Sequence, residues 1–333
     1  MPEKTTPESG AAVGPAAPVT AGPTAAPDVS GATLAAAEAF TDKGPSKPRS
    51  LGADAWKSLR GRVIFWVSVV LLVLFVLMAA VPSLFSATDP NHADLAHHYL
   101  GTPKFSHVFQ EDWFGYNEQG QSVWSRTVHG ARASITVGVF VTLATSVIGG
   151  FIGMMAGYFG GWLDSLLSRL TDIFFGIPLL LGALVLLQAF PTRTVWTVVL
   201  GLSVFGWMQG ARVMRGAVIT QKQADFVTAA KALGAGTPRI LMRHILPNAI
   251  GPVIVVATIN LGVYIAAEAT LSYLGIGLMP PTVSWGVDIS NAQNTLRDAP
   301  HVLLFPAAFL SLTVLAFILL GDAVRDALDP KLR

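Results

Sequence analysis

The stretch Asp225-Phe-Val-Thr-Ala-Ala-Lys-Ala-Leu-Gly-Ala-Gly-Thr-Pro-Arg-Ile-Leu-Met-Arg-His-Ile-Leu-Pro247 separates two strongly apolar segments and decides the fold. Its first half is built from strong helix formers, and Gly234 can supply the left-handed residue that stops a helix. Thr237 is expected to cap a second short helix, with Pro238 in the first turn of that helix. Pro247 is expected to end or kink it. The sequence therefore predicts two short helices joined by a glycine turn at a membrane surface.

The composition of the whole chain supports this setting. The 333 residues are 52% hydrophobic and only 13% charged, and their mean hydropathy is +0.55. This balance indicates an all-α, polytopic membrane protein. The chain has no cysteine, which excludes disulfides, thiolate catalysis and cysteine-ligated metals. The net charge of +2 is near neutral and gives no indication of nucleic-acid binding.

Six apolar runs have about the length needed to cross a membrane as helices. They cover residues 63–81, 134–157, 172–190, 194–212, 250–272 and 302–321. Residues 1–55, rich in Ala, Pro, Thr and Gly, are expected to form a disordered cytoplasmic tail. The remainder, 56–333, is then a transmembrane domain with outer loops at 83–133 and 274–300 and a cytoplasmic loop at 215–249.

The distribution of basic residues predicts the orientation. The lysines and arginines that fall on the outer side in this arrangement are Lys104, Arg126, Arg132, Arg193 and Arg297, and all the others fall on the inner side. Because cytoplasmic loops carry the excess of basic residues, both termini are expected in the cytoplasm.

The spacing within 225–247 resembles the "EAA" loop of ABC-importer permeases. Ala229, Ala230, Gly234, Leu246 and Pro247 match that pattern, whereas Thr228 stands where the family usually has Glu. The sequence His244-Ile-Leu-Pro-Asn248 is most similar to the corresponding segment of the peptide and nickel importers. Three further segments resemble the same branch: Gly115–Ser134, Ser272–Gly286 with Pro280-Pro281 and Ser284-Trp285-Gly286, and Leu320–Pro330.

The resemblance implies the type I ABC-importer permease fold with six transmembrane helices, in a bacterial inner membrane. It implies half of a translocation path for di- or oligopeptides, completed by a second, non-identical permease. It further implies two cytoplasmic ATPases that bind ATP and Mg²⁺, an extracytoplasmic solute-binding protein, and contact with membrane lipid. The chain itself is expected to bind no cofactor and no metal, and to have no catalytic residue.

The resemblance also assigns roles within the cytoplasmic loop, which corresponds to the coupling helix of the family. Ala229 and Ala230 are expected to allow close docking on the ATPase, Gly234 to make the turn, and Pro247 to join the loop to the fifth span. Arg239 and Arg243 are expected to face acidic groups or lipid phosphates. The first helix of the loop includes Asp225 and Thr228.

Other candidate residues lie outside that loop. Glu268 is an ionisable residue in an apolar run, and is interpreted either as a translocation-path residue or as a structural hydrogen-bonding group. Gly149, Gly153 and Gly157 share one helix face and indicate close packing, either at a subunit interface or within the chain. Asp164, Arg169 and Asp172 predict a helix-end ion pair. Four histidines (His92, His97, His98 and His107) lie in the first outer loop, where a solvated loop is favoured over a metal site.

Missing motifs limit the alternatives. The chain has no Gly-x4-Gly-Lys-Ser/Thr loop, so it cannot cradle ATP itself, and no His-Glu-x-x-His. Three alternatives remain besides a peptide permease: a nickel or other small-solute permease of the same family, a self-contained channel or secondary transporter, and an intramembrane enzyme.

Overall fold

A computed structural model describes residue 56 and residues 58–328, and within them the regular structure is helical. Four helices are long and apolar enough to cross a membrane: α3 (Val63–Ala80), α5 (Val123–Phe159), α12 (Leu246–Tyr273, with the turns that precede it from Thr237) and α14 (His301–Leu328). An all-α membrane protein is therefore confirmed. The predicted tail at 1–55 and the last residues of the carboxyl-terminal motif, Asp329 and Pro330, lie outside the described residues.

The predicted continuous helix over 172–190 is wrong. Helix α6 (Gly161–Phe175) ends at the fourth residue of that run, and α7 (Leu179–Leu187) begins after a break, at an angle of 79° to α6. Pro178 stands directly before α7 as its N-cap. Because proline has no amide hydrogen and disfavours helical geometry in the residue before it, the helix breaks at this point. If α6 and α7 together form one span, the number of spans rises to five.

The predicted continuous helix over 194–212 is also wrong. Helix α8 (Val195–Val204) is followed by a break at residues 205–207, and α9 (Met208–Lys222) continues beyond it. Gly206 lies in the break, where its carbonyl accepts a hydrogen bond of 2.9 Å from the Tyr264 hydroxyl. A Cβ on Gly206 would lie 2.7 Å from that hydroxyl oxygen, so a larger residue there would displace the Tyr264 side chain.

The outer segments are more helical than predicted. Helix α5 begins at Val123, eleven residues before the end of the loop predicted at 83–133, with the Ser122 side chain accepting from the Ser125 amide as N-cap. The rest of that segment contains η1 (Pro82–Leu84) and α4 (Leu95–His98). The second predicted loop, 274–300, contains α13 (Trp285–Asn291) and η3 (Ala292–Thr295).

The 225–247 segment forms α10 (Asp225–Ala232), α11 (Thr237–Arg239) and a π-helical turn, η2 (Ile240–Ile245), which leads directly into α12. The short first helix and the glycine turn are thus confirmed, but the prediction of a short second helix ended at Pro247 is wrong. The helix continues through it to Tyr273. Thr237 is also not the cap; Gly236 is the N-cap, with Thr237 and Pro238 in the first turn.

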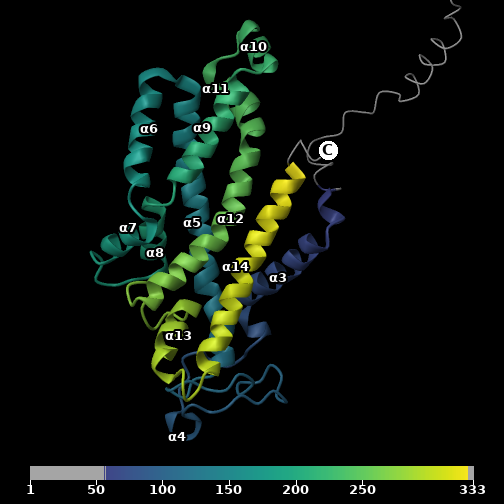
Figure 1. The fold of residues 1–333 in the computed structure, drawn as a ribbon. Coiled ribbons are helices and arrows are strands. Elements are labelled where there is room, and N and C mark those ends of the chain that lie inside the picture. The colour runs from purple at the N-terminus through teal and green to yellow at the C-terminus, as the bar shows by residue number, and fades with distance from the viewer. Residues whose placement is uncertain (1–55, 57, 329–333) are drawn as a thin grey trace, which may run out of the picture. The chain divides into compact units, whose positions relative to one another are not determined.

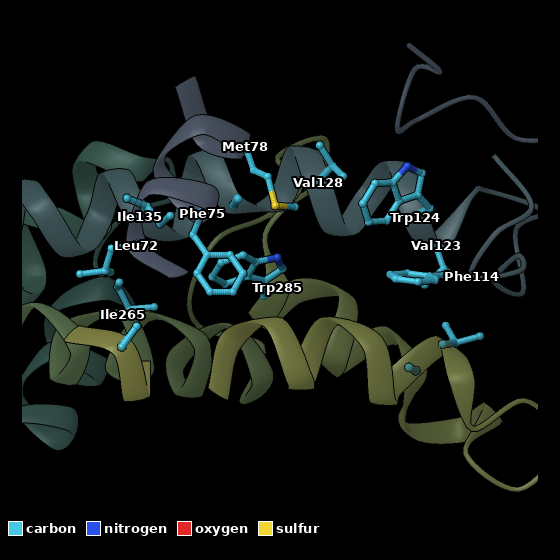
Figure 2. Packing of buried hydrophobic residues seen from close by; sticks show 14 of the residues in the cluster. Leu72, Phe75, Met78, Phe114, Val123, Trp124, Val128, Ile135, Ile265 and Trp285 are labelled. Carbon is cyan, nitrogen blue, oxygen red and sulfur yellow. The ribbon is translucent and has the colours of Figure 1, made fainter. Parts of the chain in front are cut away.

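Of the four hydrophobic clusters formed by the described residues, two lie toward opposite ends of the bundle. Figure 1 shows α10 and α11 at one end and α4 and α13 at the other. At the α13 end, aromatic and aliphatic residues of α3, α5, α13 and α14 pack together, and Figure 2 shows Phe75 beside Trp285. At the α10 end, Val227, Ile240 and Ile245 pack with residues of α5, α9 and α12 such as Met154, Met214 and Ala249.

Candidate functional site

The turn between α10 and α11 has a defined geometry. Gly234 has a φ of +76°, in the left-handed region that glycine adopts without a steric penalty. Its amide donates to the Lys231 carbonyl at 2.9 Å, and the Ala235 amide donates to the Ala230 carbonyl at 3.0 Å. These two bonds make a Schellman motif, which satisfies the carbonyls at the end of α10. The predicted glycine turn is therefore confirmed in its backbone geometry.

The helices on either side of the turn are amphipathic. Val227 and Ala230 are buried against the bundle, whereas Asp225, Thr228 and Ala229 are exposed. Leu233, at the tip, is 88% exposed. Arg239, Arg243 and Pro247 are exposed on the second half of the segment. The structure thus anchors one face of the segment and presents an apolar tip flanked by basic residues on the other.

The glycine stripe of α5 packs against α9 of the same chain. A Cβ on Gly149 would lie 2.4 Å from the Trp207 carbonyl oxygen, and one on Gly153 would lie 2.3 Å from the Ala211 carbonyl oxygen. At Gly157 the Arg215 carbonyl oxygen would lie at 2.8 Å. Of the two alternatives for this stripe, internal packing is the one for which the structure provides contacts. At these glycines the backbones of α5 and α9 approach so closely that no side chain larger than the hydrogen atom of glycine fits between them.

Two ion pairs hold α6 against α9. Asp164 accepts from the Nε and Nη2 atoms of Arg215, at 2.5 and 2.7 Å. Asp172 accepts from Arg212 at 2.7 Å, and Arg212 also lies over the Phe175 ring, 4.0 Å from its centroid. The predicted pairing of these acids with Arg169 is wrong, because both carboxylates point across to α9 and meet its arginines.

Glu268 lies in a cage of serine hydroxyls with no exposed surface within the chain. Ser134 on α5 donates to one carboxyl oxygen at 2.9 Å, and Ser272 and Ser284 donate to the other at 2.8 and 3.1 Å. Two of these hydroxyls also accept backbone amides: Ser272 from Leu278 and Ser284 from Val287. Glu268 therefore connects α5, α12, the segment after α12, and the N-terminus of α13.

Two further contacts attach α13 to α5. Arg126 donates to Asp288 through Nε at 2.8 Å and through Nη2 at 2.5 Å, and both side chains are buried. The Trp285 indole donates to the Thr127 carbonyl at 2.8 Å. Sequence reasoning treated Arg126 as an outer-loop charge and gave the Ser-Trp-Gly motif no role. Every residue from Val123 to Val128 is buried, so no one-sided helical pattern in the sequence marks Arg126 as a buried residue.

Three of the four outer-loop histidines contact neighbouring protein groups. His97 contacts Asp94 at 3.0 Å, His98 stacks on Tyr116 with 4.2 Å between ring centroids, and His107 contacts Asp112 at 2.9 Å. Burial opposes ionisation of Asp112, but hydrogen bonds from Lys104 and His107 outweigh it and lower the pKa of that carboxyl. Within residue 56 and residues 58–328, no group of three or more His, Cys, Asp or Glu side chains is arranged to hold a metal ion.

Comparison with known proteins agrees with this architecture. Residues 149–333 match the family model "Binding-protein-dependent transport system inner membrane component", and residues 50–101 match "N-terminal TM domain of oligopeptide transport permease C". The chain is 36% identical over 292 residues to the oligopeptide transport system permease protein OppC of Bacillus subtilis (strain 168), covering 88% of this chain and 93% of that one.

Two other relatives are similar over most of their length. The dipeptide transport system permease protein DppC of the same Bacillus strain is 38% identical, with 89% of this chain and 90% of that one covered. The glutathione transport system permease protein GsiD of Escherichia coli O6:K15:H31 (strain 536 / UPEC) is 34% identical, with 87% and 93% covered. The interpretations as a self-contained channel or an intramembrane enzyme are thereby set aside. The chain belongs to the binding-protein-dependent inner membrane components of the OppC/DppC type, the non-catalytic, multi-pass permease subunits of ABC importers.

Proposed function

We propose that this chain forms half of the translocation path of an ATP-driven peptide importer and that residues 225–247 couple the path to cytoplasmic ATPases. The observation that carries the proposal is the geometry of that segment. Its turn is fixed by the Schellman bonds at Gly234, one face is buried against α5, α9 and α12, and the Leu233 tip is exposed. A rigid, anchored helix pair with a free apolar tip is suited to transmit a push from a partner to the spans.

The proposal includes the six-span, type I arrangement. The six spans would be α3, α5, α6 with α7, α8 with α9, α12, and α14. An even number of crossings puts both termini on the same side, and the basic residues of α9 and the 225–247 segment favour the cytoplasm for the α10 end. The outer end, with α4 and α13, would then receive substrate from a solute-binding protein. A second, non-identical permease and two ATPases holding ATP and Mg²⁺ would complete the complex.

Peptides are the proposed cargo. The relatives are named for the transport of oligopeptides, dipeptides and glutathione, all of which contain peptide or peptide-like amide bonds. The nickel alternative has no support from the outer-loop histidines, since each of three has a separate protein partner: His97 on Asp94, His98 on Tyr116 and His107 on Asp112. Uptake of a labelled tripeptide by cells that carry the whole transporter, competed by excess dipeptide or by Ni²⁺, distinguishes the two cargoes. Competition by Ni²⁺ alone would contradict peptide cargo.

The roles proposed for single residues follow from whether their side chains are exposed or buried. Asp225, Thr228 and Ala229 lie on the exposed side of α10, where they would contact the ATPase, while Ala230 lies on the buried side and would hold α10 on the bundle. Arg239 and Arg243 would face acidic ATPase groups or lipid phosphates. Glu268 would act at the outer end of the path through the groups it holds, because its carboxyl is enclosed by serines.

A pair of glycine substitutions tests the coupling role. Gly234 and Gly216 both have open space around the position of a Cβ, but only Gly234 has a positive φ. Gly234→Val therefore forces the turn out of its left-handed geometry, whereas the matched control Gly216→Val adds the same bulk to α9 without that strain. Uptake is expected to fall severalfold in Gly234→Val only, with equal amounts of both variants in the membrane.

Recovery of the ATPase subunits provides the second measurement. Affinity purification in mild detergent is expected to recover them with the wild-type chain and with Gly216→Val, but with lower yield from Gly234→Val. Equal uptake and equal ATPase recovery in both variants would contradict coupling through this turn.

A further inference from the structure

Asn260 and Ser146 are half-buried polar residues in the middle of the bundle. Asn260 lies midway along α12, and the stretch 253–267 around it contains no charged residue. Ser146 lies on α5. Among the residues that the structure describes, none forms a hydrogen bond with the Asn260 side-chain amide or the Ser146 hydroxyl. Two polar groups at membrane depth therefore lack a partner within the described chain.

A neighbouring hydroxyl shows how such a group is satisfied by its own helix. Thr258, also on α12, donates to the Ile254 carbonyl at 2.9 Å. The side-chain polar atoms of Ser146 and Asn260 make no such bond and retain exposed surface, so a partner from outside the chain can reach them. Hydrocarbon offers no hydrogen bond, and a polar group left against it costs free energy. These two side chains therefore belong beside water or a polar partner, not beside lipid tails.

Both side chains line one small recess between three helices. The other residues that line it are Thr145 of α5, Gly206 and Gly210 at the start of α9, and Val253, Val256 and Ala257 of α12. Its volume is about 10 Å³, close to what one water molecule needs. The recess therefore admits a single polar group of a ligand. Ser146, Val253 and Ala257 also line an adjacent apolar groove of about 350 Å³, which has room for an apolar side chain of the same ligand.

The recess lies where the helix pair α8 and α9 is interrupted. Residues 205–207 are not helical, and α5, α9 and α12 pack against one another at this level of the bundle (Figure 1). Non-helical backbone at membrane depth is tolerated only where it is buried in protein or lines a water-filled cavity, and interrupted helices line substrate sites in transporters. The helix break and the unpartnered side chains are separate observations that indicate the same place.

We propose that Asn260 and Ser146 bind main-chain amide groups of the peptide cargo as it crosses the membrane. A carboxamide has both an acceptor oxygen and N–H donors, so Asn260 can pair with the C=O and the N–H of one residue in an extended peptide. Main-chain groups are common to all peptides, and a contact with them does not depend on the cargo's side chains. This inference rests on the proposed function, and it adds a cargo-binding site on this chain.

A helix of the second permease is the other candidate partner, because polar side chains also form hydrogen bonds between membrane helices. The interrupted helix beside the recess favours the cargo, since a contact between two helices does not require a break in a third. The two occupants also predict different results when Asn260 is replaced.

Uptake of trialanine by the assembled transporter in proteoliposomes, with its binding protein, is the direct test. Asn260→Leu keeps a similar volume and removes both polar groups, and it is expected to lower uptake about tenfold, as the loss of one or two hydrogen bonds would. The matched control is Thr258→Val, whose lost hydroxyl is already bonded within α12; it is expected to retain uptake. Uptake that is unchanged in Asn260→Leu overturns the proposal.

An altered cargo separates direct contact from a structural role. In an ester analogue of trialanine, an oxygen replaces the N–H of the central residue, so one of the proposed bonds is already absent. Asn260→Leu is expected to lower uptake of this analogue by a smaller factor than uptake of trialanine. Selection by the binding protein cancels, because each factor compares variant and wild type with one substrate. Equal factors for the two substrates, or loss of the second permease on affinity purification of Asn260→Leu, overturn the proposal.

A labelling experiment decides the question if Asn260→Leu fails to assemble. The chain has no cysteine, so Asn260→Cys carries its single thiol. A charged, water-soluble methanethiosulfonate is expected to modify this thiol, and saturating trialanine to slow the reaction. The control is Val70→Cys on the apolar helix α3, where Val70 is 64% exposed; it is expected to stay unmodified. No reaction at Asn260→Cys, or a rate that trialanine leaves unchanged, overturns the proposal.

Failure of the proposed function gives a different result. The wild-type transporter would then take up no trialanine, whereas modification of Asn260→Cys by the charged reagent would still report whether residue 260 lines a water-filled path. The two proposals are therefore separable in one set of preparations.

Discussion

Replacement of Gly153 by alanine tests the close packing of α5 on α9 against a control three residues away. A Cβ on Gly153 would lie 2.3 Å from the Ala211 carbonyl oxygen and 2.9 Å from the Arg215 amide nitrogen. A Cβ on Gly150 would have the Met214 methyl group as its nearest neighbour, at 3.7 Å, an ordinary contact. The two substitutions add the same methyl group to the same helix, and only one of them meets backbone.

The expected magnitudes follow from two opposing terms. Glycine to alanine inside a helix gains up to about 1 kcal/mol of helix propensity at either position. At Gly153 the methyl group must push α9 away by about 1 Å, and overpacking of this kind costs about 1–3 kcal/mol. Gly150→Ala is therefore expected to be neutral or slightly stabilising, and Gly153→Ala to destabilise the protein by about 1–2 kcal/mol.

Unfolding of the purified variants in mixed detergent, followed by circular dichroism as the fraction of SDS rises, measures the difference. Uptake by cells provides a second observable, since α9 leads into α10 and a displaced α9 moves the 225–247 segment. Equal stabilities for Gly153→Ala and Gly150→Ala would refute the argument that the backbones of α5 and α9 touch at Gly153.

Three other substitutions or conditions test the outer end. Glu268→Ala removes the acceptor of three hydroxyls and is expected to lower stability by about 3 kcal/mol, at about 1 kcal/mol per bond; Glu268→Gln, which keeps one oxygen, is expected to lose about half of that. Equal losses of uptake without any loss of stability would instead favour direct contact of Glu268 with cargo. Arg126→Met strands the buried Asp288 carboxylate and is expected to cost about 3–5 kcal/mol, while the double variant with Asp288→Leu recovers most of it; thermal unfolding that shows additive losses would contradict the buried pair. The pKa of Asp112 is lower in the folded protein than in the unfolded chain, where it is about 4. The ionised carboxylate therefore stabilises the fold above that pH, and this stabilisation is lost as the pH falls through the lower, folded pKa. Limited proteolysis of residues 84–122 is therefore expected to accelerate in wild type below about pH 4 and to show less pH dependence in Asp112→Asn.

The sequence predicted the parts of the molecule that depend on local chemistry. Gly234 is at a left-handed turn because only glycine adopts that φ freely, and Gly149, Gly153 and Gly157 share a face because of their spacing. Hydropathy identified the apolar runs, but it does not report where a run is broken. The break before α7 has a local signal, Pro178, which hydropathy alone does not register. The break at Gly206 coincides with a tertiary contact, the hydrogen bond from Tyr264.

The partners of polar groups were beyond sequence reasoning for a related reason. Asp164 and Asp172 lie near Arg169 in the chain, yet they bond to Arg215 and Arg212, which only the packing of α6 on α9 brings close. Of the serines around Glu268, Ser134 lies 134 residues away in sequence, whereas Ser272 and Ser284 lie 4 and 16 residues away. The π winding at Ile240–Ile245 was also not predicted, because the buried Leu241 and Ile245 keep the four-residue spacing of an ordinary α-helix.

The length of α5 has a consequence for where the bundle extends beyond the lipid. Its 37 residues span about 55 Å, and the hydrocarbon layer of a bilayer is about 30 Å thick. The charged residues of α5, Arg126 and Arg132, lie within its first ten residues, and none follows them up to Phe159. The length in excess of the hydrocarbon layer therefore belongs mainly to the α13 end, where Arg126 and the Thr127 carbonyl of α5 bind Asp288 and Trp285 of α13. Helix α13 is thus supported outside the lipid by a helix that is itself anchored in it.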